Sequence, residues 1–156
     1  MALQTGQKAP AFTLVADDKQ EVSLSDFAGQ NVVLLFFPLA FTSVCTTELC
    51  TMRDDLQQYK DLNAQVLAVS VDSPFTLEAF KQQQNLPFPL LSDFNKATSR
   101  AYDALYEDFV LNMKGVSKRA AFVIDEKGKI RYAEVLENAG ELPDLAAVKK
   151  SLAALN

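Results

Sequence analysis

The chain has 156 residues, of which 49% are hydrophobic and 22% charged, a composition typical of a globular domain that needs no disulfide or structural metal. Its 15 basic and 20 acidic residues give a formal charge of −5, and no basic run offers the surface that nucleic acids or anionic membranes require. The absence of histidine excludes Ser-His-Asp and Cys-His catalysis and every histidine-bearing zinc site.

The chain has two cysteines, Cys45 and Cys50, which are too few for an all-cysteine zinc site and point to redox chemistry. The N-terminal residues show neither the apolar core of a signal peptide nor an Arg-rich transit pattern. The longest uncharged apolar run, 32–41, contains Pro38 and is about half as long as a membrane span. We therefore expect a soluble protein of the reducing cytoplasm, in which a disulfide is transient.

The first third of the chain predicts strands and then a helix. Short strands are predicted over 11–15 and 21–24, followed by a capped helical turn at 25–29 that ends in glycine. The run 32–37 is continuously β-branched and aromatic, which is typical of a strand buried on both faces, and Pro38 ends it. After Pro38 the apolar residues recur with the period of a helix. The residues on this helical face are Cys45, Leu49, Met52, Leu56 and Tyr59.

The rest of the chain alternates strands with helices. In chain order the predicted elements are a strand at 65–71, a helix capped by Ser73 and running from Pro74 to 84, a strand at 88–91, a helix at 95–102, a hairpin of strands 120–125 and 129–135, and a helix at 143–155. This alternation predicts an α/β, thioredoxin-like fold in a single domain spanning 1–156. It consists of a mixed central sheet flanked by helices on both faces.

The segment from Pro38 to Cys45 lies where the buried strand gives way to the helix. A thiol in the first helical turn lies near unpaired backbone N–H groups, and these groups and the helix dipole favour the thiolate. An unperturbed thiol, with a pKa of about 8.5, holds only a few per cent of this nucleophilic form at neutral pH. Thr42 is placed to hydrogen-bond both the sulfur and an incoming hydroxyl, and Pro38 shields the sulfur from water.

The pattern Pro-x3-Thr-x2-Cys, formed by Pro38, Thr42 and Cys45 after a buried strand, resembles the active-site motif of the peroxiredoxins. The stretch Arg-Ala-Ala-Phe-Val-Ile-Asp that begins at Arg119 resembles the strand whose arginine faces the peroxidatic cysteine in that family. The other matching stretches are 6–12 and 66–72. The resemblance therefore covers essentially the whole chain.

Two subfamilies are represented in the motif region. The sequence Cys-Thr-Thr-Glu-Leu-Cys at 45–50 is similar to that of the bacterioferritin-comigratory, or peroxiredoxin Q, subfamily. The preceding stretch, 36–42, instead resembles the alkyl hydroperoxide reductase E group, in which the later cysteine is often absent. The presence of Cys50 favours the Q type.

The resemblance implies a thiol-dependent peroxidase that requires no metal, haem or flavin. Cys45 attacks H2O2 or an organic hydroperoxide and becomes a sulfenic acid, while Arg119 stabilises the thiolate and polarises the peroxide. Glu48 resembles the family glutamate that orients this arginine. Cys50 then forms an intramolecular disulfide with Cys45, which a thioredoxin- or glutaredoxin-like donor reduces. Related proteins occur as monomers and as homodimers.

Helix geometry limits the resolving role of Cys50. Residues five positions apart in an intact helix have Cα atoms roughly 8.6 Å apart, whereas a disulfide needs about 7 Å or less. A bond between Cys45 and Cys50 therefore requires unwinding of a segment that includes 42–53. Otherwise Cys50 is a packing residue, and the protein is a one-cysteine peroxiredoxin resolved by an external thiol.

Two other classes of protein also use paired cysteines. A thioredoxin-like dithiol oxidoreductase normally carries Cys-x2-Cys, whereas the spacing here is Cys-x4-Cys. A peroxide-sensing redox switch would consume one equivalent of peroxide rather than turn over. Less specific roles are also open: Thr42 as a helix cap, Glu48 as a charge complementing the helix dipole, and Arg119 as an ordinary ion-pair residue.

Overall fold

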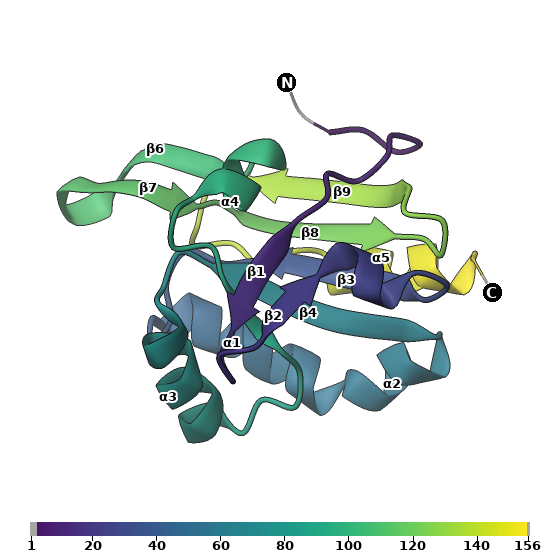
Figure 1. The fold of residues 1–156 in the computed structure, drawn as a ribbon, viewed down its shortest axis with the longest axis horizontal. Helices are drawn as coiled ribbons and strands as arrows, with labels where there is room; N and C mark the ends of the chain where they lie inside the picture. Colours follow the sequence, from purple (N-terminus) through teal and green to yellow (C-terminus); the bar gives the residue numbers. More distant parts are fainter. Residues whose placement is uncertain (1–2, 156) are drawn as a thin grey trace.

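A seven-stranded mixed sheet organises the fold, which the computed structural model describes for residues 3–155 (Figure 1). From edge to edge its strands are β2 (Glu21–Ser23), β1 (Thr13–Ala16), β5 (Leu90–Ser92), β4 (Ala64–Ser70), β3 (Asn31–Phe36), β8 (Arg119–Ile124) and β9 (Ile130–Leu136). The pairs β3–β4 and β4–β5 are parallel, and the other four pairs are antiparallel. This confirms the expected mixed sheet of a thioredoxin-like α/β fold.

Alternation along the central strands gives the sheet two apolar faces. In β3, Val33 and Leu35 belong to one buried cluster, while Val32, Leu34 and Phe36 belong to another. The helices over the first face are α1 (Ser43–Asp54), α2 (Leu56–Asp61), α3 (Pro74–Gln84) and α5 (Leu145–Ala153). The second face is covered by the N-terminal segment, by η1 (Leu24–Phe27) and by the end of α4 (Ala97–Ala101). Helices therefore lie on both faces, with the longer ones on one.

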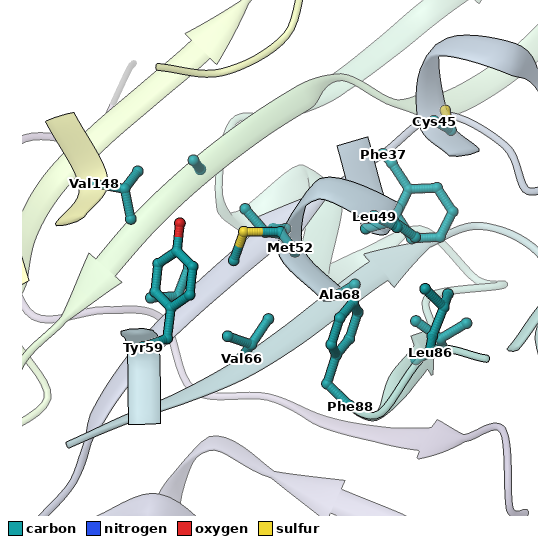
Figure 2. Packing of buried hydrophobic residues seen from close by; sticks show 14 of the residues in the cluster. Phe37, Cys45, Leu49, Met52, Tyr59, Val66, Ala68, Leu86, Phe88 and Val148 are labelled. Atoms are coloured by element: carbon teal, nitrogen blue, oxygen red, sulfur yellow. The ribbon is translucent and has the colours of Figure 1, made fainter. Parts of the chain in front are cut away.

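Figure 2 shows the apolar cluster beneath α1 and α2. Leu49 and Met52 of α1 and Tyr59 of α2 pack with Val66 of β4, and Cys45 lies at one end of the cluster. Each of these side chains is at most 1% exposed. Burial of one large apolar side chain contributes about 1.5–3 kcal/mol, so this contact holds α1 firmly on the sheet.

The helix predicted over this face is divided at Asp55, whose backbone (φ −98°, ψ 5°) ends α1 and precedes α2. Asp54 and Asp55 stand at a helix C-terminus, where unpaired carbonyl groups disfavour negative charge. Asp55 pairs instead with Lys149 of α5, with its Oδ2 2.9 Å from Nζ. The apolar spacing continues through Leu56 and Tyr59 and so predicts one unbroken helix. The break lies instead at Asp55, a polar residue that this spacing does not report on.

No element is predicted between 103 and 118, yet this segment forms a second, two-stranded sheet. Strands β6 (Leu105–Phe109) and β7 (Met113–Ser117) pair antiparallel across η2 (Val110–Asn112). Both strands are partly exposed and carry charged residues, which removes the alternation on which strand prediction depends. The tip also uses positive φ angles at Leu111 (59°) and Asn112 (61°), which non-glycine residues rarely adopt.

The remaining predicted elements are present with ends shifted by a few residues. The hydroxyl of Ser73 accepts the N–H of Thr76 and caps α3, as predicted. The last helix begins at Leu145 rather than 143, because Asp144 accepts the N–H of Ala147 at 3.0 Å and caps it there. Among residues 3–155, no helix combines the length and apolar character needed to cross a membrane.

Candidate active site

The loop between β3 and α1 is held against the end of β4. Asp72 follows β4, and its Oδ2 accepts the N–H of Ala40 at 2.8 Å and the hydroxyl of Ser70 at 2.6 Å. Within the loop, Pro38 is buried and Phe41 has a φ of 69°, in the left-handed region that non-glycine residues rarely adopt. The neighbouring strand therefore sets the path by which the chain enters α1.

Thr42 occupies the N-cap position of α1 through its extended backbone (φ −92°, ψ 151°), but its side chain makes no capping bond. Its hydroxyl donates to the carbonyl of Leu39 at 2.8 Å. We expected this hydroxyl to bond the sulfur of Cys45, but within residues 3–155 no hydrogen bond joins the two side chains. Because the hydroxyl proton is committed to Leu39, the exposed oxygen is left to accept a further hydrogen bond.

Cys45, Glu48 and Arg119 form a buried cluster, with exposures of 0%, 0% and 2%. Nη2 of Arg119 donates to the sulfur of Cys45 at 3.3 Å, and Nη1 donates to Oε2 of Glu48 at 3.1 Å. Nε and Nη2 also donate to the carbonyl oxygen of Ala139, at 3.0 and 2.8 Å. One guanidinium thus joins the thiol, the carboxyl group and the loop that follows β9.

The register of the sheet explains how residues 74 positions apart meet. Strand β8 runs antiparallel to β3, and Ala120 pairs with Phe36, the last residue of β3. Arg119 therefore begins β8 beside the point where the chain leaves β3 for α1. Side chains alternate along a strand, so Arg119 shares a face with Ala121, which lies in the cluster beneath α1. The arginine consequently points toward α1 and not toward the opposite face.

The cluster combines one cation with two acidic groups. Burial raises the pKa of Glu48 from 4.5 to about 8, although the charge and hydrogen bond of Arg119 lower it. Oε1 of Glu48 is buried and has no hydrogen-bond partner among the described residues. Cys45 is the third residue of α1, where backbone N–H groups lack helical partners and favour negative charge on the sulfur. The site is therefore suited to a thiolate beside a neutral carboxyl group.

Cys50 faces a different part of the molecule from Cys45. Its half-buried thiol donates to Oε1 of Gln84, the last residue of α3, at 3.4 Å. Arg53, one turn later in α1, donates to the backbone carbonyl of the same Gln84. Both cysteines are free thiols within the continuous helix α1. The structure therefore holds them apart in the reduced state.

Comparison with known proteins defines the class of this site. The chain belongs to the AhpC/TSA family, whose profile matches residues 5–133. It is a peroxiredoxin, an enzyme that reduces peroxides with a cysteine thiol.

The relatives come from both subfamilies that the motifs resemble. Alkyl hydroperoxide reductase E of Mycobacterium tuberculosis is 40% identical over 156 residues, covering 98% of each chain. The putative peroxiredoxin bcp of Coxiella burnetii is 40% identical over 132 residues, covering 83% of this chain and 87% of the relative. The structure of a cysteine-to-serine mutant of PrxQ from Xylella fastidiosa superposes with a TM-score of 0.87 at 28% identity, covering 99% and 98% of the two chains. The predicted mixture of subfamily features is confirmed.

The predicted site residues are distributed over three places. Cys45, Glu48 and Arg119 meet in the buried cluster, while Pro38 and Thr42 lie in the adjoining loop. The remaining predicted residue, Cys50, lies against α3.

Three residues that contact the site were not predicted as site residues from the sequence. Ala139 contributes only its backbone carbonyl, so its residue type says nothing about the contact with the arginine. Gln84 is an ordinary polar residue in a helical pattern. Asp72 ends the stretch 66–72 that matches the family, and a carboxylate directly after a buried strand was the one signal available there.

Proposed function

We propose that this peroxiredoxin reduces H2O2 and organic hydroperoxides through a sulfenic acid on Cys45, which Cys50 resolves as an intramolecular disulfide. A thioredoxin- or glutaredoxin-like donor in the cytoplasm then reduces the disulfide. The observation that carries the proposal is the 3.3 Å contact between Nη2 of Arg119 and the sulfur of Cys45 inside a buried cluster. A fixed cation at this distance stabilises the thiolate that the reaction needs.

In the first step the thiolate of Cys45 attacks the terminal oxygen of the hydroperoxide, and the O–O bond breaks. Arg119 stabilises the negative charge while it moves from sulfur to the leaving oxygen. The hydroxyl of Thr42 donates its own proton to the carbonyl of Leu39, so its oxygen accepts a hydrogen bond from the O–H of the incoming hydroperoxide. Phe41 is 49% exposed beside the same loop and offers an apolar contact for the alkyl group of an organic substrate.

In the second step α1 must open. An intact helix holds the Cα atoms of Cys45 and Cys50 roughly 8.6 Å apart, beyond the reach of a disulfide. The first turns therefore unwind before the sulfenic acid meets the second thiol. The bond from Cys50 to Gln84 opposes this movement and favours a second candidate function, a one-cysteine peroxiredoxin that an external thiol reduces.

Replacing Cys50 with serine distinguishes these two functions. If Cys50 resolves, Cys50→Ser still reduces one equivalent of peroxide but accumulates as a sulfenic acid, because the chain has no other second thiol. Mass spectrometry should show a Cys45–Cys50 disulfide in the native protein and one added oxygen in the variant. Thr47→Ser, an equally small change on the exposed side of α1, serves as the control.

Two results would contradict this assignment. Native protein that carries a sulfenic acid and a free Cys50 after peroxide treatment is a one-cysteine enzyme. Consumption of a single equivalent, without turnover in the presence of a thioredoxin system and external thiols, indicates a sensor.

Oxidation is also expected to remove the amide protection of α1. Because the disulfide requires unwinding, exchange between residues 42 and 53 should accelerate, while α5 keeps its protection and serves as an internal reference. The free energy of unfolding should be equal or lower in the oxidised protein, because so short a loop restricts the unfolded chain little while native helix is lost. Disulfide-bonded protein in which α1 exchanges as slowly as before would refute the unwinding step.

A further inference from the structure

Arg119 lies between two groups that can each carry a negative charge. Its Nη2 is 3.3 Å from the sulfur of Cys45, and its Nη1 is 3.1 Å from Oε2 of Glu48. No side chain of the three is more than 2% exposed. The other acceptor of the guanidinium is the uncharged carbonyl of Ala139. Two potential anions therefore share one cation in an almost completely buried place.

A single buried cation can neutralise the charge of only one buried anion. With both Cys45 and Glu48 ionised, the cluster would hold a net negative charge in the protein interior, whereas with one ionised it is neutral. The raised pKa of Glu48, about 8, agrees with a carboxyl group that is protonated at neutral pH. The unpartnered Oε1 agrees as well, because a buried oxygen without a donor is tolerated better on a neutral acid than on a carboxylate.

Among the described residues, no other charged group acts on the Glu48 carboxyl group. Arg119 of β8 is the charged group that acts on Glu48, both by attraction and by hydrogen bonding. A further acid on the same face of the sheet, Glu134 of β9, accepts bonds from the hydroxyl of Tyr132 and the N–H of Asp144. The charge of the cluster therefore depends on Cys45 and Glu48.

We propose that Cys45 and Glu48 alternate as the counter-ion of Arg119: Glu48 is protonated while Cys45 is a thiolate, and it ionises when Cys45 is oxidised. This inference rests on the proposed function of Cys45. It makes Glu48 a charge-balancing residue that acts through the arginine.

The oxidation step then balances without a proton from solvent. The sulfur gives an electron pair to the terminal oxygen, the O–O bond breaks, and the second oxygen leaves as an alkoxide. The terminal oxygen keeps its hydrogen in the sulfenic acid, the alkoxide gains a proton, and Glu48 loses one. Thiolate, carboxylic acid and hydroperoxide become sulfenic acid, carboxylate and alcohol, with one negative charge on each side. A chain without histidine has no imidazole to provide this proton.

Infrared difference spectroscopy tests the exchange directly. In the Cys50→Ser background, one equivalent of peroxide should remove the carbonyl stretching band of one protonated carboxylic acid at neutral pH. The band should shift with ¹³C-labelled glutamate and be missing when Glu48→Gln is added. Glu21→Gln, on the exposed edge strand β2 at the far side of the sheet, should leave it unchanged.

Cys45→Ser provides a second test that needs no variant of Glu48. Its neutral hydroxyl cannot balance Arg119, so Glu48 should already be ionised and the acid band absent from the spectrum at neutral pH. A protonated glutamate in this variant, at the intensity of the reduced native protein, would overturn the inference.

Proton counting separates failure of the inference from failure of the proposed function. On sulfenic acid formation in weak buffer at neutral pH, Cys50→Ser should take up no proton, while addition of Glu48→Gln should produce an uptake of about one proton per peroxide. Sulfenic acid formation with equal proton uptake in the two proteins, or with an unchanged acid band, overturns the exchange and leaves the function of Cys45 intact. Failure to form a sulfenic acid removes the proposed function, and the inference with it.

Discussion

Replacing Cys45 with serine is expected to reduce peroxide turnover to the uncatalysed level. The serine hydroxyl remains protonated at neutral pH and is a far weaker nucleophile than a thiolate, even beside Arg119. The substitution is nearly equal in size, so the packing of α1 against the sheet should be preserved. Peroxide consumption with a thioredoxin system measures the loss, and circular dichroism with thermal unfolding checks the fold.

Cys50→Ser is the matched control, because it removes the other cysteine and leaves the buried cluster intact. It should retain the first reaction with peroxide, which Cys45→Ser should lose. Appreciable turnover by folded Cys45→Ser protein would show that another group reacts with the peroxide, and the assignment of Cys45 would be wrong.

Replacing Arg119 with alanine is expected to slow oxidation of Cys45 by about 10²-fold or more, the loss typical of one preorganised electrostatic donor. The variant also leaves Glu48 and the Ala139 carbonyl without their described donor, which should lower the free energy of unfolding by about 1–3 kcal/mol. The chain has no tryptophan, so the second-order rate is measured by rapid quenching and mass spectrometry of the modified thiol.

Arg100→Ala is the control for this change, because Arg100 forms an exposed ion pair with Glu107 and should lose neither rate nor much stability. If Arg119→Ala does not fold, Arg119→Lys keeps the charge but loses the forked contact to three partners, and it should still slow the reaction. A rate equal to that of the native protein in either folded variant would remove Arg119 from the mechanism.

Much of the site was predictable because its signals are local. A strand buried on both faces followed by a helix places Cys45 in a first helical turn whatever the remainder of the chain does. The apolar stripe through Leu49 and Met52 depends on helical spacing alone, and the structure buries it as predicted. The position of Arg119 in an otherwise apolar strand likewise signalled a specific partner, although it did not identify the partner.

Other features escaped prediction because their causes are not local. The hairpin of β6 and β7 has partly exposed strands, so apolar alternation does not mark it, and its tip takes positive φ angles at Leu111 and Asn112 without a glycine. The hydroxyl of Thr42 bonds Leu39 and not the sulfur, a choice made by the loop that Asp72 holds in place. Cys50 lies against Gln84 because the C-terminal end of α3 lies beside that part of α1.

The sequence by itself indicated the cysteine that we propose as nucleophile, its helical position, the absence of histidine chemistry and the mixed α/β class. Each of these follows from residue type or from spacing within one element. The tertiary structure alone decided that Arg119 touches Cys45 and Glu48 together, because that contact depends on the order and register of β3 and β8. It also decided that Glu48 is buried deeply enough for its pKa to be raised, since desolvation arises from all the elements packed around the carboxyl group.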